Sequence, residues 1–470
     1  TGIVGGIDEL GPAVTTTDNN SYSHNYGVES YLARINYGFK SRYYIDASWR
    51  TDGSSRFHPS DRWGHFWSVG ASWRISEEQF MENTRQWLDN LTLKVSYGVQ
   101  GNDNLGTYYA WQGLYDYTWP NATDAGAFVD KLENRKVTWE KNGNLNAGIE
   151  ATMFGGRLGV SVEYYNRKTR DMLLNSPLPI STGFTGFNDN VGSLRNQGLE
   201  VSLRGTILDK RDFRWDATLM GSFNRNKVLS LTGGQDVITS GIRVIEVGRP
   251  IYTFYLPKTA GVDPATGKQL YYAYWTQTVN DEGTLVNTRC DEYITDNVAM
   301  ATLSKYYHES REPKLFGSIG STFTILKNID VSFLTTYSIG GWVYDGLYNG
   351  SMYVQYAGNN WHKNAKRRWQ KPGDKTDVPM LEVGGSYATT SNSLIDASYF
   401  AIKNITVGYT LPKRWLKKID IESLRIYATL DNIAMFNHMD GMDPQYNFTG
   451  SVAYSYTPSR VIAFGIDLNF

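Results

Sequence analysis

Alternation of apolar and polar residues is the feature that most constrains the fold of this chain. In the segment SRVIAFGIDLNF, a strand would present only apolar side chains on one face, namely Ile462, Phe464, Ile466, Leu468 and Phe470. The same period of two recurs in the segments LTLKVSYGV, RLGVSVEYY, IDVSFLTTYSIG and SLRIYATLD. Because helices repeat every 3.6 residues and strands every two, these segments predict amphipathic strands.

The connections between these segments alternate in length. Short turns are expected at 39–42, 154–157, 208–212 and 326–330, and long polar stretches at 101–141, 169–193, 228–314, 341–396 and 433–459. Short turns at one end and long loops at the other are typical of an up-and-down membrane barrel. We therefore predict an all-β, transmembrane, antiparallel up-and-down β-barrel with roughly thirteen strands of about ten residues each.

This strand count predicts that residues 1–470 are the C-terminal portion of a larger barrel domain, because bacterial barrels normally have an even number of strands. We expect residues 423–432 and 460–470 to be neighbouring antiparallel strands, with the apolar residues Leu424, Ile426, Leu430, Ile462, Phe464, Ile466 and Leu468 facing lipid. Polar residues such as Lys94, Glu163, Glu200, Arg204 and Arg425 are expected to face the lumen. Residues 77–90 are expected to form a longer periplasmic connection with a helical turn.

Composition and charge exclude several classes of protein. Basic residues number 46 and acidic residues 47, so no net positive field points to nucleic acid as a partner. Cys290 is the only cysteine, which excludes a disulfide framework and a cysteine-rich zinc site. The six histidines are scattered without paired ligand spacing, so no metal and no cofactor are predicted. The aromatic content of 14% suits strands and membrane interfaces.

An ordered series of sequence blocks resembles the SusC/RagA-type TonB-linked outer-membrane transporters. These blocks include TDGSSRFHPSDRWG, LKVSYGVQGN, GRLGVSVEYYNRKTRDMLL, NVGSLRNQGLEVSL, VGRPIYTFY, ASYFAIKNITVGYTLPKRWL and GMDPQYN, and they span nearly the whole chain. The resemblance implies a 22-stranded barrel that holds an N-terminal plug. It further implies outer-membrane lipid around the barrel, a SusD-like surface lipoprotein as a lid, and the TonB complex as the source of energy. Neither a plug domain nor a TonB box matches this sequence, so both are expected on an N-terminal part outside it.

Aromatic residues in the long stretches are the candidate substrate-binding residues. They are Trp111, Tyr115, Trp119, Trp342, Tyr344 and Trp361. Flat aromatic faces stack on sugars and pack against peptides, so these residues suit a glycan or a peptide as substrate. The same residues would also suit an interface girdle or the packing of loops.

The block DGSSRFHPSDRWG contains serine, histidine and aspartate, as an enzyme would need, but lacks a nucleophile elbow. We expect a hairpin loop in which Arg56, Asp61 and Arg62 pair with one another, and we predict no catalytic residues. The basic run HKNAKRRWQKPGDK is expected to be a solvated outer loop.

The favoured function is that of an outer-membrane, TonB-dependent, SusC-like nutrient importer that binds and imports glycans or peptides and is not an enzyme. One alternative is a surface carbohydrate-binding or glycan-degrading all-β protein. The other is an adhesive outer-membrane barrel that transports nothing. Hydrolysis of a glycan by the purified protein would favour the first alternative, and function without TonB would favour the second.

Overall fold

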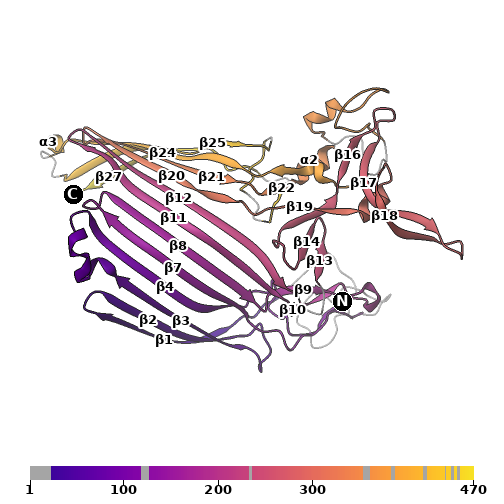
Figure 1. The fold of residues 1–470 in the computed structure, drawn as a ribbon, viewed down its shortest axis with the longest axis horizontal. Coiled ribbons are helices and arrows are strands. Elements are labelled where there is room, and N and C mark those ends of the chain that lie inside the picture. Colours follow the sequence, from indigo (N-terminus) through magenta and orange to yellow (C-terminus); the bar gives the residue numbers. More distant parts are fainter. Residues whose placement is uncertain are drawn as a thin grey trace, which may run out of the picture. The chain divides into compact units, whose positions relative to one another are not determined.

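The computed structural model describes residues 23–117, 126–231, 236–352, 360–382, 387–416, 421–439, 441–445, 449–452 and 456–470. Its main element is a 13-stranded sheet in which each long strand is hydrogen-bonded to the long strands before and after it in the chain (Figure 1). The strands are β1 (Val28–Phe39), β2 (Tyr43–Ser54), β3 (Trp63–Arg74), β4 (Leu88–Asn102), β7 (Glu140–Met153), β8 (Leu158–Arg170), β11 (Ser193–Lys210), β12 (Phe213–Ser230), β20 (Leu315–Ile325), β21 (Ile329–Ile339), β24 (Tyr399–Thr410), β25 (Ser423–Asn437) and β27 (Val461–Asn469). This order confirms the predicted up-and-down arrangement and the predicted number of strands.

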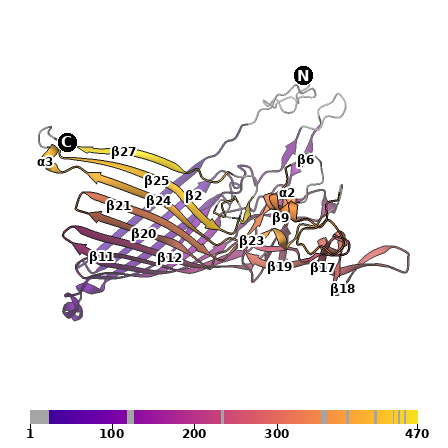
Figure 2. The same cartoon turned by 90° about the horizontal axis from the view of Figure 1, so that it is seen from above.

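The chain forms two compact units. The first contains residues up to 154 together with 162–198 and 226–238, and the second contains 155–161, 199–225 and 239–470. In the first unit, β1 to β4 and β7 pair antiparallel in sequence order. In the second, β20, β21, β24, β25 and β27 do the same and lie side by side in both views (Figures 1 and 2).

Small sheets and short helices fill the long connections. In the first unit they are β5 (Leu114–Asp116), β6 (Phe128–Lys131), β9 (Leu173–Pro177), η3 (Ile180–Thr182) and β10 (Gly186–Asn190). In or next to the second unit they are β13 (Val237–Ser240), β14 (Arg243–Glu246), β15 (Thr253–Pro257), β16 (Thr259–Val262), β17 (Gln269–Val279), β18 (Leu285–Thr295), α1 (Val298–Leu303), β19 (Lys305–Ser310), β22 (Trp342–Asp345), α2 (Gly346–Met352), η4 (Lys363–Arg367), η5 (Ser391–Ser393), β23 (Leu394–Asp396) and β26 (Ser451–Val452).

The predicted short turns are tight hairpins. The turn from β1 to β2 places Lys40 and Ser41 at φ of 53° and 55°, and the turn from β20 to β21 places Leu326 and Lys327 at 52° and 63°. Two successive left-handed residues match the right-handed twist of the paired strands, which offsets the strain that non-glycine residues bear there. These turns therefore hold the strands in register without glycine at their centres.

Two connections at the short-turn end contain short helices. Residues between β3 and β4 form η1 (Ile75–Glu77) and η2 (Gln79–Thr84), which confirms the helical turn predicted within 77–90. The connection from β24 to β25 contains α3 (Lys413–Leu416). Glu78 fixes the first connection, because its carboxylate accepts hydrogen bonds from Arg42 at 3.1 Å and from the Trp73 indole at 3.1 Å. Within the part of the chain that the structure describes, no helix is long and apolar enough to cross a membrane.

The antiparallel pairing of β25 with β27 confirms that the two C-terminal strands are neighbours, as expected. Leu424 lies opposite Leu468, Ile426 opposite Ile466 and Leu430 opposite Ile462, so the apolar residues share one face. That face is uncovered: the exposed fractions of Ile462, Phe464 and Ile466 are 61%, 82% and 68%. An uncovered apolar face on paired strands fits contact with lipid.

The opposite face of the same strands carries charge. The Arg425 guanidinium lies 2.6 Å from Asp330 on β21 and 3.1 Å from Asp467 on β27, so it bridges three strands. Gly408 on β24 lies between them, and a Cβ there would be 2.5 Å from the Asp330 carboxylate and 2.6 Å from the Arg425 side chain. Glycine at this position is what lets the arginine cross its neighbouring strand.

The DGSSRF block forms a small core at the end of the first unit away from the short turns. Phe57 and Val137 are fully buried there, together with Phe66 and Trp139. Arg56 lies above two tyrosine rings, at 4.6 Å from Tyr26 and 5.1 Å from Tyr108, in the geometry of a cation–π contact.

The ion pair of Arg56 corrects the pairing expected within this loop. Its guanidinium lies 3.2 Å from Asp103 in the following connection, and Asp61 instead accepts a hydrogen bond from the hydroxyl of Ser60. The physical reason is that Asp103 also accepts from Ser54 at 2.7 Å and from Tyr26 at 2.9 Å, which gives a half-buried carboxylate several donors. These contacts of Asp103 with Tyr26, Ser54 and Arg56 join two connections, and we call them the lock.

Asp103→Asn should destabilise this lock by about 1–3 kcal/mol, because the amide cannot accept all three hydrogen bonds as the carboxylate does. The measurement is the temperature to which the detergent-solubilised protein must be brought before electrophoresis for its compact form to disappear from the gel. Asp281→Asn, at an exposed turn, is the matched control. Equal behaviour of the two variants would contradict the lock.

Gly408→Ala should destabilise the protein by about 1–3 kcal/mol, because a methyl group would separate Arg425 from Asp330. Gly320→Ala on β20 should be close to neutral, since a Cβ there would meet no atom nearer than 3.9 Å. Both changes remove a strand glycine, so the difference between their unfolding midpoints in denaturant isolates the charged bridge. Equal midpoints would show that the bridge adds nothing.

Candidate functional site

The described residues of three long connections in the second unit join into one body. We call it the outer-loop platform; it comprises the described residues within 239–314, 340–398 and 438–460. Backbone hydrogen bonds link the three connections: Tyr344 donates to the carbonyl of Gly450 at 2.7 Å, and Met380 donates to that of Gly267 at 2.7 Å. A short parallel pairing of β22 with β26 adds to them. The described loops therefore support one another instead of extending separately into solvent.

Glycines make the close approach of these connections possible. Gly450 has φ of 82°, and a Cβ there would lie 2.9 Å from the side chain of Arg311. Gly267 has φ of 75°, and its Cβ would lie 2.4 Å from the ring of Trp369. Both positions combine a left-handed backbone with a close neighbour, so any other residue would part the connections.

A cavity of about 540 Å³ opens in this platform beside β15 and β19. Arg249, Tyr307, His308, Glu309 and Trp342 supply its charged and aromatic walls. The Arg249 guanidinium lies 3.7 Å from the centre of the Tyr307 ring, and its Nε lies 2.6 Å from Glu246. The arginine is therefore held flat against the ring by its carboxylate partner.

Burial shifts the pKa values of Tyr307 and His308 in this cavity toward their neutral forms. Burial, and then the hydrogen bond and charge of Glu246, raise the pKa of the Tyr307 hydroxyl. Burial and the charge of Lys258 lower the pKa of His308, although the carbonyl of Leu256 opposes this shift. The Nε2 atom of His308 lies 3.1 Å from that carbonyl, so the ring donates a hydrogen bond to it. The walls offer hydrogen-bonding groups and aromatic faces.

A group of tyrosines lies next to this cavity on β17 and β19. The rings of Tyr274 and Tyr306 meet edge to face at 5.3 Å, and the Lys258 ammonium lies 4.3 Å above the ring of Tyr272. Burial raises the pKa of Tyr274 to about 12, and its hydroxyl donates to the carbonyl of Lys305 at 2.6 Å. Tyr271 is buried in the platform, where its hydroxyl accepts from the backbone of Ala388.

Of the predicted aromatic residues, three lie in the platform. Trp342 and Tyr344 both pack against the buried cluster of Phe254, Leu256 and Leu394, and Trp342 also lines the cavity. Trp361 packs against a separate cluster around Met352 and Val378. The structure therefore brings Trp342 and Tyr344 together, and Trp361 belongs to another part of the platform.

The other predicted aromatic residues belong to the first unit or are not described. Trp111 packs against the cluster around Phe57 and meets the His58 ring edge to face at 5.1 Å. The Tyr115 side chain is 57% exposed and lies near Tyr117, with ring centres 6.5 Å apart. Trp119 lies outside the described residues.

Sequence reasoning missed Arg249 and Tyr307, which form the central stack of the cavity. The signal for Arg249 was present, because this residue belongs to the block VGRPIYTFY. Tyr307 stands 58 positions further along in KYYHES, and no pattern in the sequence connects the two segments. Their contact arises from the pairing of β14 and β15 with β19.

The arrangement is suited to binding. The Nε2 atom of His308 is engaged with the carbonyl of Leu256. Among the residues that the structure describes, no three His, Cys, Asp or Glu side chains are grouped as metal ligands. What the cavity offers is an aromatic face, a planar cation and several hydrogen-bonding groups, the features of a site for a polar organic ligand.

The chain is similar to known proteins over almost its full length. It is 28% identical over 469 residues to the TonB-dependent receptor SusC of Bacteroides thetaiotaomicron. This match covers 96% of this chain and 45% of that protein. It is also 28% identical over 490 residues to TonB-dependent receptor P26 of Formosa agariphila, covering 97% of this chain and 47% of that receptor. The chain thus spans about half the length of the curated relatives it matches.

A solved structure and a family match agree with these relatives. The structure of the RagAB peptide transporter superposes with a TM-score of 0.82 at 29% identity, over 97% of this chain and 49% of that one. Residues 3–433 match the family described as TonB dependent receptor-like, beta-barrel. The chain therefore belongs to this family, as a β-barrel of SusC/RagA type in the outer membrane.

Proposed function

We propose that this chain is the C-terminal portion of the barrel domain of a TonB-dependent importer that takes up glycans or peptides across the outer membrane. The observation that carries this proposal is the outer-loop platform with its open cavity, at one end of strands that have a lipid-compatible face. Importers must bind their substrate outside before it passes the barrel, and an ordered platform with an aromatic, hydrogen-bonding cavity meets that need.

The remainder of the barrel, the plug and the TonB box are proposed to lie on the part of the full-length protein outside this sequence. Two facts support this arrangement. The chain covers 45–47% of its curated relatives. Every residue of β1 is exposed, and β1 and β27 are the two edges of the 13-stranded sheet. Strand edges in a membrane require hydrogen-bonding partners, so further strands would complete the sheet.

Trp342 is the residue that we propose for direct contact with substrate, together with the stack of Arg249 on Tyr307. Tyr344 and Trp361 are proposed to act through the platform, because each packs against a buried cluster and, unlike Trp342, neither is among the residues that line the cavity. Trp111, Tyr115 and Trp119 remain candidate contacts on other connections. The Trp342 face suits a sugar ring, and the Arg249 cation suits a carboxylate or a carbonyl oxygen, so both substrate classes stay open.

The proposed partners are a SusD-like surface lipoprotein and the TonB complex. Similarity to SusC and to the RagAB transporter supports both partners. The lipoprotein would contact the outer loops, and the TonB complex would contact the N-terminal part of the full-length protein. In this role the protein breaks no bond: it binds, and energy from TonB drives release inward. The family match supports an importer over a soluble carbohydrate-binding or glycan-degrading protein.

Trp342→Ala should weaken substrate binding by roughly two- to tenfold, the range expected for losing one aromatic contact. The measurement is the concentration of glycan or peptide that gives half-maximal growth of cells dependent on this importer. Trp415→Ala is the control, because Trp415 is exposed on α3 at the short-turn end of the sheet. An equal effect of both changes would place substrate elsewhere.

Uptake through this protein should disappear when TonB is deleted, while binding of substrate to the cell surface persists. Accumulation of a labelled substrate inside cells, measured with and without TonB, tests the energy coupling. A surface level of the protein that is equal in both strains is the required control. Undiminished accumulation without TonB would exclude the importer, and binding with no accumulation in either strain would favour an adhesin.

A further inference from the structure

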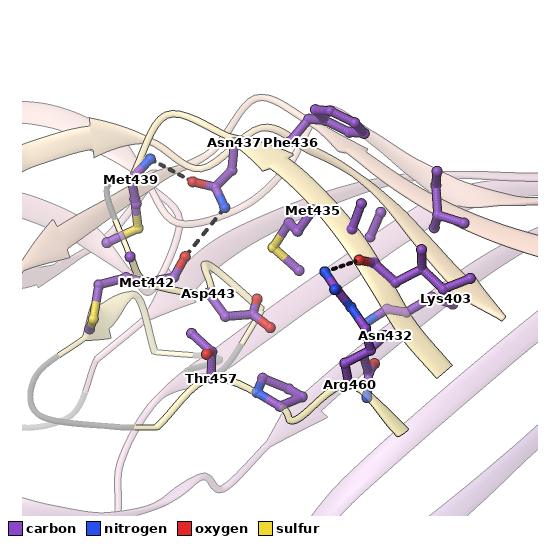
Figure 3. Close-up of a pocket in the computed structure, with 16 residues that line it drawn as sticks. Lys403, Asn432, Met435, Phe436, Asn437, Met439, Met442, Asp443, Thr457 and Arg460 are labelled. Carbon is purple, nitrogen blue, oxygen red and sulfur yellow. Dashed lines mark hydrogen bonds between the residues drawn. The ribbon is translucent and has the colours of Figure 1, made fainter. Parts of the chain in front are cut away.

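A second cavity, of about 500 Å³, lies where β24, β25 and β27 meet the connection 438–460 (Figure 3). Its floor is buried and includes Ala401, Met439, Met442 and Asp443, whereas Arg460 at its mouth is exposed. All of its lining residues belong to the second unit. The aromatic residues predicted from the sequence do not line it, so it is separate from the cavity beside Trp342.

Irregular strand pairing creates this cavity. Leu334 and Thr335 on β21 are consecutive, but their partners on β24, Asn404 and Ile402, are two residues apart, which leaves Lys403 extra. On the other side, the partners of these two β24 residues on β25 are three residues apart. Bulges insert residues in this way, bend a strand and redirect side chains, often next to functional sites.

Among the residues that the structure describes, two cations of the cavity are paired with no carboxylate. Lys403 lies at the bulge and lines the cavity, and none of the ion pairs or hydrogen bonds between described residues involves its ammonium. Arg460 donates to the backbone carbonyl of Ile433 at 2.8 Å and, within the described residues, meets no carboxylate. Asn432 stands beside them at φ of 51°, and its amide donates to the carbonyl of Ser459 at 3.1 Å. Figure 3 shows Lys403, Asn432 and Arg460 gathered on one side of the cavity.

The carboxylate of Asp443 does not neutralise these cations. It accepts a hydrogen bond from the backbone of Gln445 at 2.8 Å, and the residue is 5% exposed. Nearby, Asn437 accepts from the backbone of Met439 at 2.6 Å and donates to the carbonyl of Met442 at 3.3 Å. These bonds fold the connection back over the strands and make a preformed floor. The floor and the cationic side are therefore built by different residues.

Methionines form much of the apolar wall of this cavity. Met435, Met439 and Met442 line it, and Ile402, Ile433 and Phe436 line it as well. Methionine side chains adapt to varied aliphatic and aromatic side chains. This methionine wall thus suits an apolar amino-acid side chain.

We propose that this cavity binds the C-terminal residue of a short peptide, with the α-carboxylate between Lys403 and Arg460 and the side chain against the methionine wall. Asn432 also lines the cavity, and its side-chain oxygen could accept a hydrogen bond from the peptide backbone of the ligand. The proposal deepens the proposed importing function by choosing the peptide class. Binding at this cavity is nevertheless measurable without transport.

The test measures binding of acetyl-Ala-Ala-Leu as the free acid, and as its C-terminal amide, to the purified full-length protein in detergent by calorimetry. The free acid should bind, and the amide should bind about ten- to a hundredfold more weakly, the effect of losing a charge-assisted hydrogen bond. Lys403→Met should weaken binding of the free acid to the same degree and leave binding of the amide unchanged. Lys413→Met on α3, which follows the opposite end of β24 from Lys403, is the matched control and should bind as the unaltered protein does.

Several outcomes would overturn the proposal. Equal affinity for acid and amide, no binding of either, or a Lys403→Met protein that binds the free acid normally would each do so. Methyl glucuronide binding in place of the peptide would assign the cavity to acidic sugars and would also overturn it. Loss of peptide accumulation in cells with binding intact would instead count against the importing function and leave the carboxylate site standing.

Discussion

Every backbone group in the hydrocarbon part of a membrane must be hydrogen-bonded within the protein, and the rest of this structure follows from that requirement. Antiparallel pairing between successive strands satisfies it for the wall. With the backbone so engaged, alternation decides the faces: Ile462, Phe464 and Ile466 stand on one side of β27, while Asp467 reaches Arg425 on the other. A charge is tolerated in such a wall only on the wet side, and there it is shared between two carboxylates.

Order in the outer connections has a different origin, since water can satisfy loop backbones. Here the order comes from burial of small clusters, such as Phe254 with Leu256 and Leu394, and from glycines that let neighbouring connections approach closely. The sites that follow from this order differ in character. One cavity presents an arginine over the Tyr307 ring, already paired with Glu246; the other presents Lys403 and Arg460, which within the described residues form no ion pair with a carboxylate. A matched cation offers shape and hydrogen bonds, whereas unmatched cations select for negative charge.

Much of the wall could be predicted from the sequence because its rules are local. Period-two alternation places Leu424, Ile426 and Ile462 on one face whatever the rest of the chain does, and the turn at 326–330 follows from its neighbours. The loop contacts could not be predicted this way. Arg56 finds Asp103 across 47 positions, and Arg249 finds Tyr307 across 58, through packing that no repeat encodes. Aromatic residues alone did not identify the binding cavity, because aromatic residues such as Tyr344 and Trp361 also pack the loops.

The extra residue at Lys403 changes which side chains of β24 lie on each face of the sheet. From Gly408 through Thr406 to Asn404, even-numbered residues lie on the polar face, where Thr406 meets Thr429 at 2.9 Å and Asn404 meets Asp431 at 2.7 Å. Beyond Lys403 the frame is reversed: Phe400 stands with Phe436 on the uncovered side, and Ala401 turns inward with an exposed fraction of 1%. One inserted residue therefore exchanges the two faces of the strand. After Lys403 the odd-numbered side chains of β24 face lipid, whereas before Lys403, at the outer-loop end, the odd-numbered Ala401 faces inward and supports the loops.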